Sequence, residues 1–274
     1  MTETSTPDAP TTSITTPFLI DTHTHLDDPD FADDLDAVIA QSRDAGVSAW
    51  INVGYEPSRW SSTIDLATRI PGMRHMLGMH PSSADQWSAT TERELRRLLI
   101  ETGAVAIGEI GLDFLRDHAP RDAQFDAFQA QLDLAEELDL PAVIHMRDAE
   151  AALLDVLTSR STLPPLLLHS YDGGRDLTDH VITNGVRIGV GGLATRQKSE
   201  ALREQIARVP LEQIVLETDS PYLVPARQKI RRNTPVHVRT IAQFLADLRE
   251  TDLDTIARTT TQNALTFFRK LSLP

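Results

Sequence analysis

The chain has 274 residues, of which 41% are hydrophobic, and this is enough for a complete core in one domain of the size that α/β barrels commonly reach. Its formal net charge of −14 argues against broad electrostatic binding of duplex nucleic acid, so an anionic substrate would need local cations from a metal or a basic loop. The absence of cysteine excludes disulfides, Cys-type zinc fingers and a thiol nucleophile.

The two ends of the sequence and its apolar runs suggest where the protein resides. No apolar run approaches the length of a membrane span, and the N-terminus lacks the basic and apolar parts of a secretory signal. We therefore expect a soluble, cytoplasmic monomer with no membrane partner. Residues 1–17 are mostly Thr, Ser and Pro, which predicts a disordered tail ahead of a single domain over residues 18–274.

From Phe18 onward, short apolar runs alternate with helical patterns. The runs, which predict buried strands, are residues 18–23, 47–53, 73–79, 104–109, 141–144, 166–168, 186–190 and 214–219. The helical patterns are residues 31–44, 55–69, 92–101, 121–138, 149–159, 198–208, 235–249 and 253–268. This alternation predicts a parallel sheet, either closed as a TIM (β/α)₈ barrel or open and doubly wound.

Histidines and carboxylates stand where these runs end. They are His23 and His25 on the first run, Glu109 on the fourth, His145 on the fifth, His169 on the sixth and Asp219 on the eighth. An open sheet would spread these ends along a line at about 4.8 Å per strand, whereas a barrel gathers them into one mouth. The placement of the polar residues therefore favours the TIM barrel.

Six such groups in one mouth indicate a metal centre. His23 and His25 alone could equally be two exposed loop histidines, but four of the nine histidines in the chain fall at run ends. The six exceed the needs of one tetrahedral zinc and suit two divalent ions, Mg²⁺, Mn²⁺ or Zn²⁺, which lower the pKa of water to supply a nucleophile. Glu109 is expected to bridge the ions, and Asp219 to accept the proton of the attacking water.

Longer stretches around these residues carry a family resemblance. They are DTHTHLD at 21–27, GMHP at 78–81, AIGEIGLDF at 106–114, HMRDA at 145–149, HSYDGG at 169–174, ETDSPYL at 217–223, RNTP at 232–235, and Asn263-Ala264 ahead of Phe267. In this order and spacing, the sequence resembles the TatD family of metal-dependent deoxyribonucleases, within the amidohydrolase-like barrels.

The resemblance implies hydrolysis of phosphodiesters at two metal ions. Carried over by position, the first ion takes His23, His25, Glu109 and Asp219, and the second takes Glu109, His145 and His169. The family often has cysteine where this chain has Thr24, Met146 and Ser170, and its usual Ser-Phe-Ser/Thr-Gly is replaced by Gly-Val-Gly-Gly at 189–192. The first departures should leave the chemistry intact, because strand alternation points them away from the site, while the second concerns substrate contact.

Substrate contacts are predicted from local charge. Residues 220–246 contain Arg227, Lys229, Arg231, Arg232 and Arg239 and no acidic residue, so they predict a phosphate clamp above the metals or, alternatively, a solvated loop. Arg147 lies two residues beyond His145 and could add a phosphate contact. Asn233, inside the RNTP match, is also assigned to the substrate.

Aromatic residues and the remaining histidines complete the site prediction. Tyr55, Tyr171 and Tyr222 follow strand ends and could either stack on bases or pack against the barrel rim. His80 ends the third run, and substrate contact is preferred to metal ligation because six ligands already suffice. Glu217 lies one layer below Asp219 and is expected to orient a neighbour. His75, His118, His180 and His237 are expected to be structural or solvated.

The sequence therefore predicts a deoxyribonuclease that removes nucleotides from single-stranded DNA ends, with a 3′–5′ polarity that rests on the resemblance alone. The catalytic residues are Asp219 and Glu109. One alternative is a hydrolase of another bond at the same centre, such as a D-aminoacyl-tRNA deacylase or a small-molecule ester or amide hydrolase. A second is a metal-stabilised binding protein without turnover.

Overall fold

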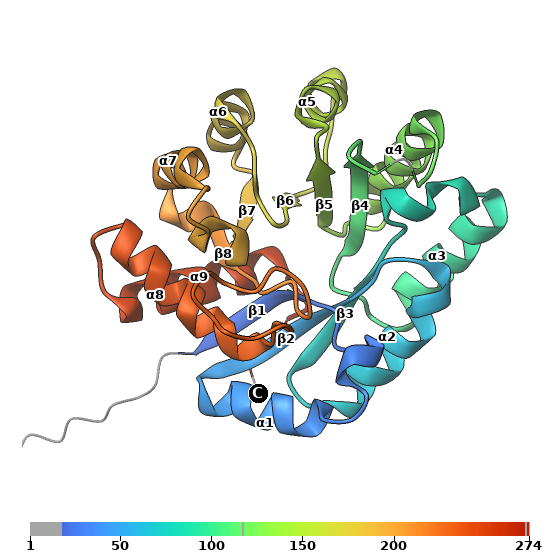
Figure 1. Cartoon of the computed structure of the whole chain (residues 1–274). Coiled ribbons are helices and arrows are strands. Elements are labelled where there is room, and N and C mark those ends of the chain that lie inside the picture. The colour runs from blue at the N-terminus through green and yellow to red at the C-terminus, as the bar shows by residue number, and fades with distance from the viewer. Residues whose placement is uncertain (1–17, 117, 272, 274) are drawn as a thin grey trace, which may run out of the picture.

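The computed structural model describes residues 18–116, 118–271 and 273, so the predicted tail over residues 1–17 lies outside the described residues. Eight parallel strands form one sheet in sequence order, with the helices arranged around it (Figure 1). The strands are Leu19–Thr24 (β1), Val47–Gly54 (β2), Met73–Leu77 (β3), Ile107–Asp113 (β4), Ala142–Arg147 (β5), Leu166–Leu168 (β6), Arg187–Val190 (β7) and Ile214–Leu216 (β8).

Hydrogen bonds between the first and last strands close this sheet into a barrel. The hydroxyl of Thr22 donates to the carbonyl of Leu216, and the backbone N–H of Asp219 donates to the carbonyl of His23 at 2.9 Å. A parallel bridge joins Thr24 to Ser220 just beyond. The predicted TIM barrel is thus confirmed, and the open doubly wound sheet is excluded.

The helices follow the strands in alternation. They are Leu35–Asp44 (α1), Pro57–Arg69 (α2), Ala89–Glu101 (α3), Arg121–Glu137 (α4), Glu150–Ser159 (α5), Arg175–Asn184 (α6), Glu200–Arg208 (α7), Val238–Leu248 (α8) and Leu253–Phe267 (α9). The pattern predicted over residues 31–44 divides into a short 3-10 turn, Pro29–Phe31, and α1. No helix is predicted between the sixth and seventh runs, yet α6 fills that place and ends at Gly185, whose φ is 67°. No helix within the described part of the chain is long and apolar enough to cross a lipid bilayer.

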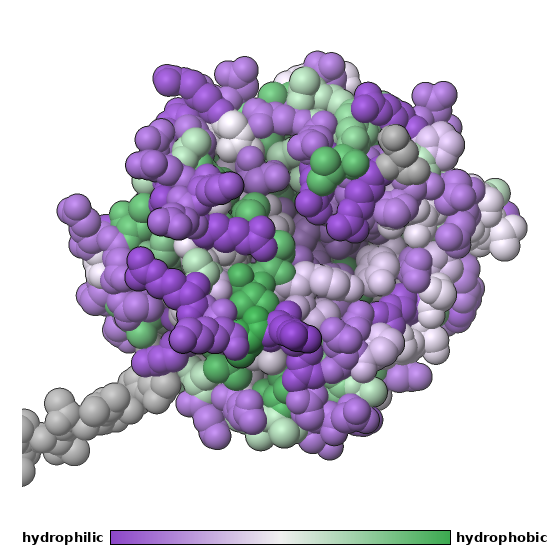
Figure 2. All heavy atoms as spheres, in the orientation of Figure 1, coloured by the Kyte–Doolittle hydropathy of each residue, from purple (hydrophilic) through white to green (hydrophobic). Residues whose placement is uncertain are grey.

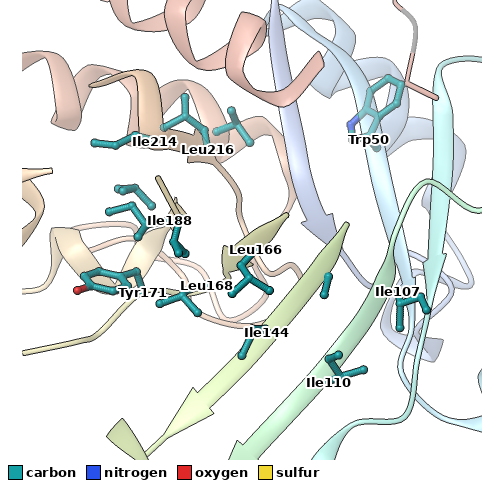
Figure 3. Packing of buried hydrophobic residues seen from close by; sticks show 14 of the residues in the cluster. Trp50, Ile107, Ile110, Ile144, Leu166, Leu168, Tyr171, Ile188, Ile214 and Leu216 are labelled. Carbon is teal, nitrogen blue, oxygen red and sulfur yellow. The ribbon is translucent and has the colours of Figure 1, made fainter. Parts of the chain in front are cut away.

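Alternation along the strands builds two hydrophobic layers. Ile144, Leu168 and Ile188 are register partners on β5, β6 and β7, and they pack side by side in the layer that contacts the helices (Figure 3). Val143, Leu167 and Val215 belong to the other layer, inside the barrel, where they cluster with Phe267 and Phe268 from the end of α9. The side chains that follow on this inner face therefore project further along the barrel interior.

The fourth strand is longer than its apolar run. The run over residues 104–109 predicts that Glu109 ends a strand, but β4 continues to Asp113 and pairs with the whole of β5. The residues from Ile107 to Asp113 are all buried, since α4 packs against the outer face of β4 and the inner face lines the barrel. Glu109 thus lies within the strand, and a second carboxylate, Asp113, stands at its end.

Candidate active site

Strand alternation places two of the predicted histidines inside the barrel. His145 lies two residues after Val143, and His169 lies two residues after Leu167, so each imidazole continues the inner hydrophobic column toward the carboxyl end of its strand. Glu217 follows Val215 in the same way. The inner layer therefore changes from apolar to polar at one level of the barrel.

Glu109 is the centre of this polar layer. Its Oε1 lies 2.6 Å from Nδ1 of His145 and 2.8 Å from Nε2 of His169, and its Oε2 lies 3.5 Å from Nε2 of His23. The two carboxylate oxygens thus face imidazoles from three different strands. This placement supports the prediction that Glu109 bridges two cations.

His23, His25 and Asp219 form the second part of the layer. Oδ1 of Asp219 lies 3.2 Å from Nε2 of His25 and 3.8 Å from Nε2 of His23. Asp219 adopts a φ of 55°, and its turn is held by the Tyr222 N–H, which donates to the Asp219 carbonyl at 2.8 Å. The barrel-closing hydrogen bonds thus bring β1 and the end of β8 together at the site.

The donor atoms fit divalent metal ions. Ligand atoms lie within 4.8 Å of one another in three groups, which are His23, His25 and Asp219; His23, Glu109 and His169; and His80, Glu109 and His145. Both ring nitrogens of His23 are buried without a hydrogen-bond partner. Burial, together with the stacked ring of His169 at 3.9 Å, lowers the pKa of His23 and keeps its lone pair free for a metal.

The two carboxylates at the centre remain ionised. Burial opposes ionisation of Glu109, but the positive potential of His169 and the hydrogen bond from His145 hold its pKa well below the usual range. Burial likewise opposes ionisation of Asp219, and the hydrogen bond from His25 outweighs it and lowers the pKa. Both groups are therefore anionic at neutral pH, as metal ligands must be.

Asp113 is a functional candidate that the sequence analysis missed. Its Oδ2 lies 3.3 Å from Nε2 of His145, while Oδ1 accepts the N–H groups of Leu115 and Arg116 at 2.9 and 3.1 Å. Burial is outweighed by the hydrogen bond and charge of His145, and the pKa of Asp113 falls to about 2. Asp113 thus holds the imidazole of His145 from its Nε2 side and keeps Nδ1 turned toward Glu109. The spacing of four residues from Glu109 was the available signal.

Glu217 lies behind His169, where it was expected to orient a neighbour. Its buried Oε1 lies 3.4 Å from Nδ1 of His169 and accepts the backbone N–H of Ser170 at 2.5 Å. A side chain at Gly189 would overlap it, because a Cβ there would lie 2.1 Å from Oε2 of Glu217. This glycine, inside the seventh strand, therefore makes room for the carboxylate.

His80 faces the same centre with its proton in a defined place. The backbone N–H of Ser82 donates to Nδ1 at 3.0 Å, so the proton of the neutral ring is on Nε2, which lies 3.8 Å from Oε1 of Glu109. Burial and the neighbouring His145 lower the pKa of His80 to about 3. This tautomer makes His80 a hydrogen-bond donor to the site, although its position also groups it with Glu109 and His145.

Comparison with known proteins identifies the family. Residues 20–269 match the sequence profile described as TatD related DNase. The chain belongs to the TatD-related DNase family. It is 36% identical over 258 residues to the "3'-5' ssDNA/RNA exonuclease TatD" of Erwinia billingiae, covering 92% of this chain and 99% of that protein. It is 34% identical over 256 residues to the protein of the same name from Escherichia coli K12, with coverages of 91% and 98%.

Solved structures of TatD relatives share the barrel. YJJV, a TatD homologue from Escherichia coli K12, superposes with a TM-score of 0.86 at 30% identity, covering 92% of this chain and 98% of that one. A TatD family hydrolase from Entamoeba histolytica superposes with a TM-score of 0.79 at 21% identity, with coverages of 91% and 97%. The predicted resemblance to the TatD family is thus confirmed.

The segment after β8 differs from the prediction in two residues. Arg232 forms a two-point ion pair with Asp34, at 2.6 and 2.9 Å, and lies over the ring of Phe31. Asn233 is fully buried, and its amide donates to the carbonyl of Thr218 at 2.9 Å. Both side chains have protein partners that hold the segment in place, which argues against their predicted contacts with substrate.

The other predicted cations remain exposed. Arg147, Arg227, Lys229, Arg231 and Arg239 lie at the surface, and none forms an ion pair with another described residue. In the view of Figures 1 and 2, the orange segment after β8 crosses the face turned to the reader, beside a hollow surrounded mostly by hydrophilic side chains. The segment after β8 thus carries three of these exposed cations, Arg227, Lys229 and Arg231, whereas Arg147 belongs to β5 and Arg239 to α8.

The three predicted tyrosines separate into two groups. Tyr171 is 3% exposed, and its hydroxyl pairs with Thr178 at 2.7 Å, so stacking on a base is excluded for it. Tyr222 is 47% exposed, and its ring lies 5.7 Å from that of His25. Tyr55 is half-buried at 5.2 Å from the same imidazole. Only Tyr55 and Tyr222 can therefore meet a substrate.

Proposed function

We propose that this TatD family member is a metal-dependent exonuclease that removes nucleotides from the 3′ end of single-stranded DNA at two divalent ions. The observation that carries the proposal is the convergence of four imidazoles and two ionised carboxylates on one point inside the barrel. The relatives named as 3'-5' ssDNA/RNA exonucleases supply the substrate and the polarity. His23, His25 and Asp219 would hold one ion, and His145 and His169 the other, with Glu109 between them.

The protein side chains have separate tasks in this reaction. The ions, Mg²⁺, Mn²⁺ or Zn²⁺, lower the pKa of water and neutralise charge on the phosphate. Asp219 accepts the proton of the attacking water, since its carboxylate is ionised and faces the centre from beside His25. Asp113 and Glu217 keep His145 and His169 in the required orientation.

Substrate binding is assigned to donors around the centre. The Nε2 proton of His80 can donate to a phosphate oxygen, because Ser82 occupies the other ring nitrogen. Arg147 and Arg231 supply exposed guanidinium groups for further phosphates. Tyr222 offers an exposed ring face beside His25 on which the terminal base can stack.

The test uses metal-stripped protein and single-stranded DNA labelled at its 5′ end. Shortening from the 3′ end after addition of Mg²⁺, Mn²⁺ or Zn²⁺, abolished by Glu109→Ala, is the expected result and identifies the working ion. An RNA of the same sequence in a parallel reaction measures sugar preference. If protein that holds two metals shortens neither strand, the proposed substrate is wrong. An aminoacyl-tRNA and a set of small esters then become the substrates to assay.

A further inference from the structure

The sheet opens between β3 and β4 on the side of the candidate site. β3 pairs with β2 along its whole length, from Met73 to Leu77. Within the described part of the chain, its register with β4 is confined to Leu77, opposite Ile107. Beyond this point the two segments run toward the site with facing edges outside the ladder. The buried backbone groups along these edges still need hydrogen-bond partners.

Two glutamines of α4 fill this opening. Gln124 and Gln131 are seven residues apart, or about two helical turns, so they project from the same side of the helix, and both are buried. α4 packs against β4, beside which it lies in Figure 1, and against the 3-10 turn Pro81–Gln86 after β3. We call the segments 78–80 and 108–113, together with these two amides, the β3–β4 seam.

Gln131 takes the place of a strand neighbour for the residue before His80. Its Oε1 accepts the N–H of Met79 at 2.7 Å, and its Nε2 donates to the carbonyl of Met79 at 3.1 Å. The other edge continues the ladder with β2, where the N–H of His80 donates to the carbonyl of Tyr55 at 2.8 Å. The backbone that carries His80 is therefore held from both sides, and with it the direction of the imidazole toward Glu109.

Gln124 forms the same contact at the end of β4. Its Oε1 accepts the N–H of Asp113 at 2.9 Å, and its Nε2 donates to the carbonyl of Asp113 at 3.1 Å. The opposite edge pairs with β5, where Asp113 is the register partner of Arg147. The Asp113 carboxylate, which lies 3.3 Å from Nε2 of His145, is thus attached to backbone that α4 holds in place.

Gln213 shows a different use of a side-chain amide, at the opposite end of the barrel. It directly precedes β8, and its Nε2 donates to the carbonyls of Val181 and Val186 at 2.8 and 2.9 Å. This amide satisfies two carbonyls near the amino ends of β7 and β8. Gln124 and Gln131 instead each bind the N–H and the carbonyl of a single residue next to the polar layer, so their placement is specific to the site.

We propose that Gln131 and Gln124 are positioning residues through which α4 sets the geometry of the site. Gln131 directs His80, whereas Gln124 holds Asp113 and, through it, His145. The inference rests on the proposed function, in which His80 donates to a phosphate oxygen and His145 binds a metal ion. Contact with both polar atoms of one residue fixes the orientation of the backbone there, whereas a single hydrogen bond leaves it free to tilt. The two glutamines should therefore affect different properties, substrate contact and metal binding.

The test replaces each glutamine by methionine, which keeps the length of the side chain but cannot form these hydrogen bonds. Gln131→Met should lower kcat/KM on single-stranded DNA by about tenfold, the cost of one hydrogen bond to a charged group, and leave the metal affinity unchanged. Gln124→Met should lower the metal affinity by about tenfold, measured without DNA by competition with a chelating dye. At saturating metal, kcat/KM of Gln124→Met should return to the wild-type value.

Three further variants control this comparison. Gln213→Met removes a side-chain amide at the other end of the barrel and should change neither quantity. Gln131→Glu keeps an acceptor for the N–H of Met79 and should recover part of the lost kcat/KM. In a His80→Ala background, Gln131→Met should have little further effect, because the side chain that it directs is absent. Glutamate variants also replace any methionine variant that proves unfolded in a melting experiment.

Several results would overturn the inference. Parallel losses of kcat/KM and metal affinity in both variants, or no loss in either, would show that the amides only stabilise the fold. A full loss from Gln131→Met in the His80→Ala background would show that Gln131 does not act through His80.

A separate measurement distinguishes failure of this inference from failure of the proposed function. If the wild-type protein holds metal but does not shorten the DNA, the proposed function is wrong, and the histidine ring signals in NMR spectra of the metal-free protein test the positioning roles. Gln131→Met should shift the signals of His80, and Gln124→Met those of His145. Unchanged signals in both variants would reject the positioning roles.

Discussion

The polar layer inside the barrel and the basic segment after β8 differ in how their charged side chains are compensated. Inside the barrel, the carboxylate of Glu109 is surrounded by imidazoles that have few other partners. In the segment after β8, Arg232 has a dedicated partner, Asp34, while its neighbour Arg231 is exposed and unpaired among the described residues. Identical side chains next to each other in sequence thus differ in whether a carboxylate compensates their charge.

This difference shows which functional groups the sequence can reveal. A strand fixes the direction of each side chain by alternation, so a histidine two residues beyond an inner valine must face the same interior. A loop fixes nothing of the kind, and an arginine there pairs with whichever carboxylate the tertiary structure brings near. The following experiments test the contrast, beginning with the largest expected effect.

Replacing Asp219 should cause the largest loss. Asp219→Asn keeps a side chain of the same shape beside His25 but removes the charge that accepts a proton, so kcat should fall by about 100- to 10,000-fold. Asp85→Asn, an exposed residue after β3, makes the same chemical change outside the site and should leave kcat unaltered. Wild-type turnover in Asp219→Asn would remove this residue from the chemistry and weaken the assignment of the inner layer as the catalytic region.

Asp113 tests whether the orientation of His145, and with it the metal affinity, depends on a hydrogen-bond partner as well as on the strand. Asp113→Asn removes the acceptor of the Nε2 proton of His145, and metal affinity should fall by about 10- to 100-fold. Competition of a chelating dye with the bound metal measures this directly. Asp126→Asn, on the exposed face of α4, is the control. An unchanged affinity in Asp113→Asn would mean that the strand alone orients His145.

His75 is a buried histidine outside the candidate site, so it tests the effect of burial without an effect on catalysis. Burial, with Arg74 and Lys270 nearby, lowers its pKa to about 4, and the ring contacts the hydroxyl of Thr102 at 2.8 Å. Below pH 6.5 the unfolded chain gains a proton that the folded protein does not, so the free energy of unfolding falls as the pH is lowered toward 4. His75→Gln should remove about 1–2 kcal/mol of this fall in denaturant titrations, with no change in activity. A pH dependence identical to the wild type would contradict the assignment.

The two adjacent arginines test the basic segment itself, with the smallest effects. Arg231→Ala should weaken binding of single-stranded DNA and reduce the slope of log K against log salt by about 0.7, the value for one phosphate contact on a single strand. Arg232→Ala should leave this slope unchanged and lower the free energy of unfolding by about 1 kcal/mol or less, since its ion pair is near the surface. Equal salt slopes for the two variants would contradict the assignment of Arg231 to phosphate binding and of Arg232 to holding the segment in place.

The fold was predictable because its signal is repeated in every unit of the chain. The eight apolar runs and most helices lie where the patterns place them, and the polar run ends select the barrel. Helix α6 was not predicted because only Leu177, Thr178 and Val181 are buried along it, which is too few for a clear helical period. The prediction missed Asp113 because it ended the apolar run at Glu109, whereas β4 continues through Gly111, whose φ of 143° suits glycine.

The errors in the substrate contacts have a common physical cause. Arg232 and Asn233 belong to a motif that marks the family, and their position after Asp219 suggested contact with substrate. In the structure they are bound by Asp34 and by the carbonyl of Thr218, groups that lie elsewhere in sequence. The partner that such a side chain binds depends on burial and on distances in the folded structure. The order of charges along the sequence contains neither kind of information.

The junction of β1 with the end of β8 also sets the order in which the molecule can mature. The carboxylate of Asp21 accepts the N–H and hydroxyl of Thr218 at 2.9 and 2.6 Å across 197 residues of sequence. Such a distant contact is slow to form, and a nascent chain cannot make it until its eighth strand has been synthesised. His23 and Asp219 meet only when that junction exists. Capture of a metal by this pair should therefore report completion of the whole barrel, and a truncated or stalled chain would be left without it.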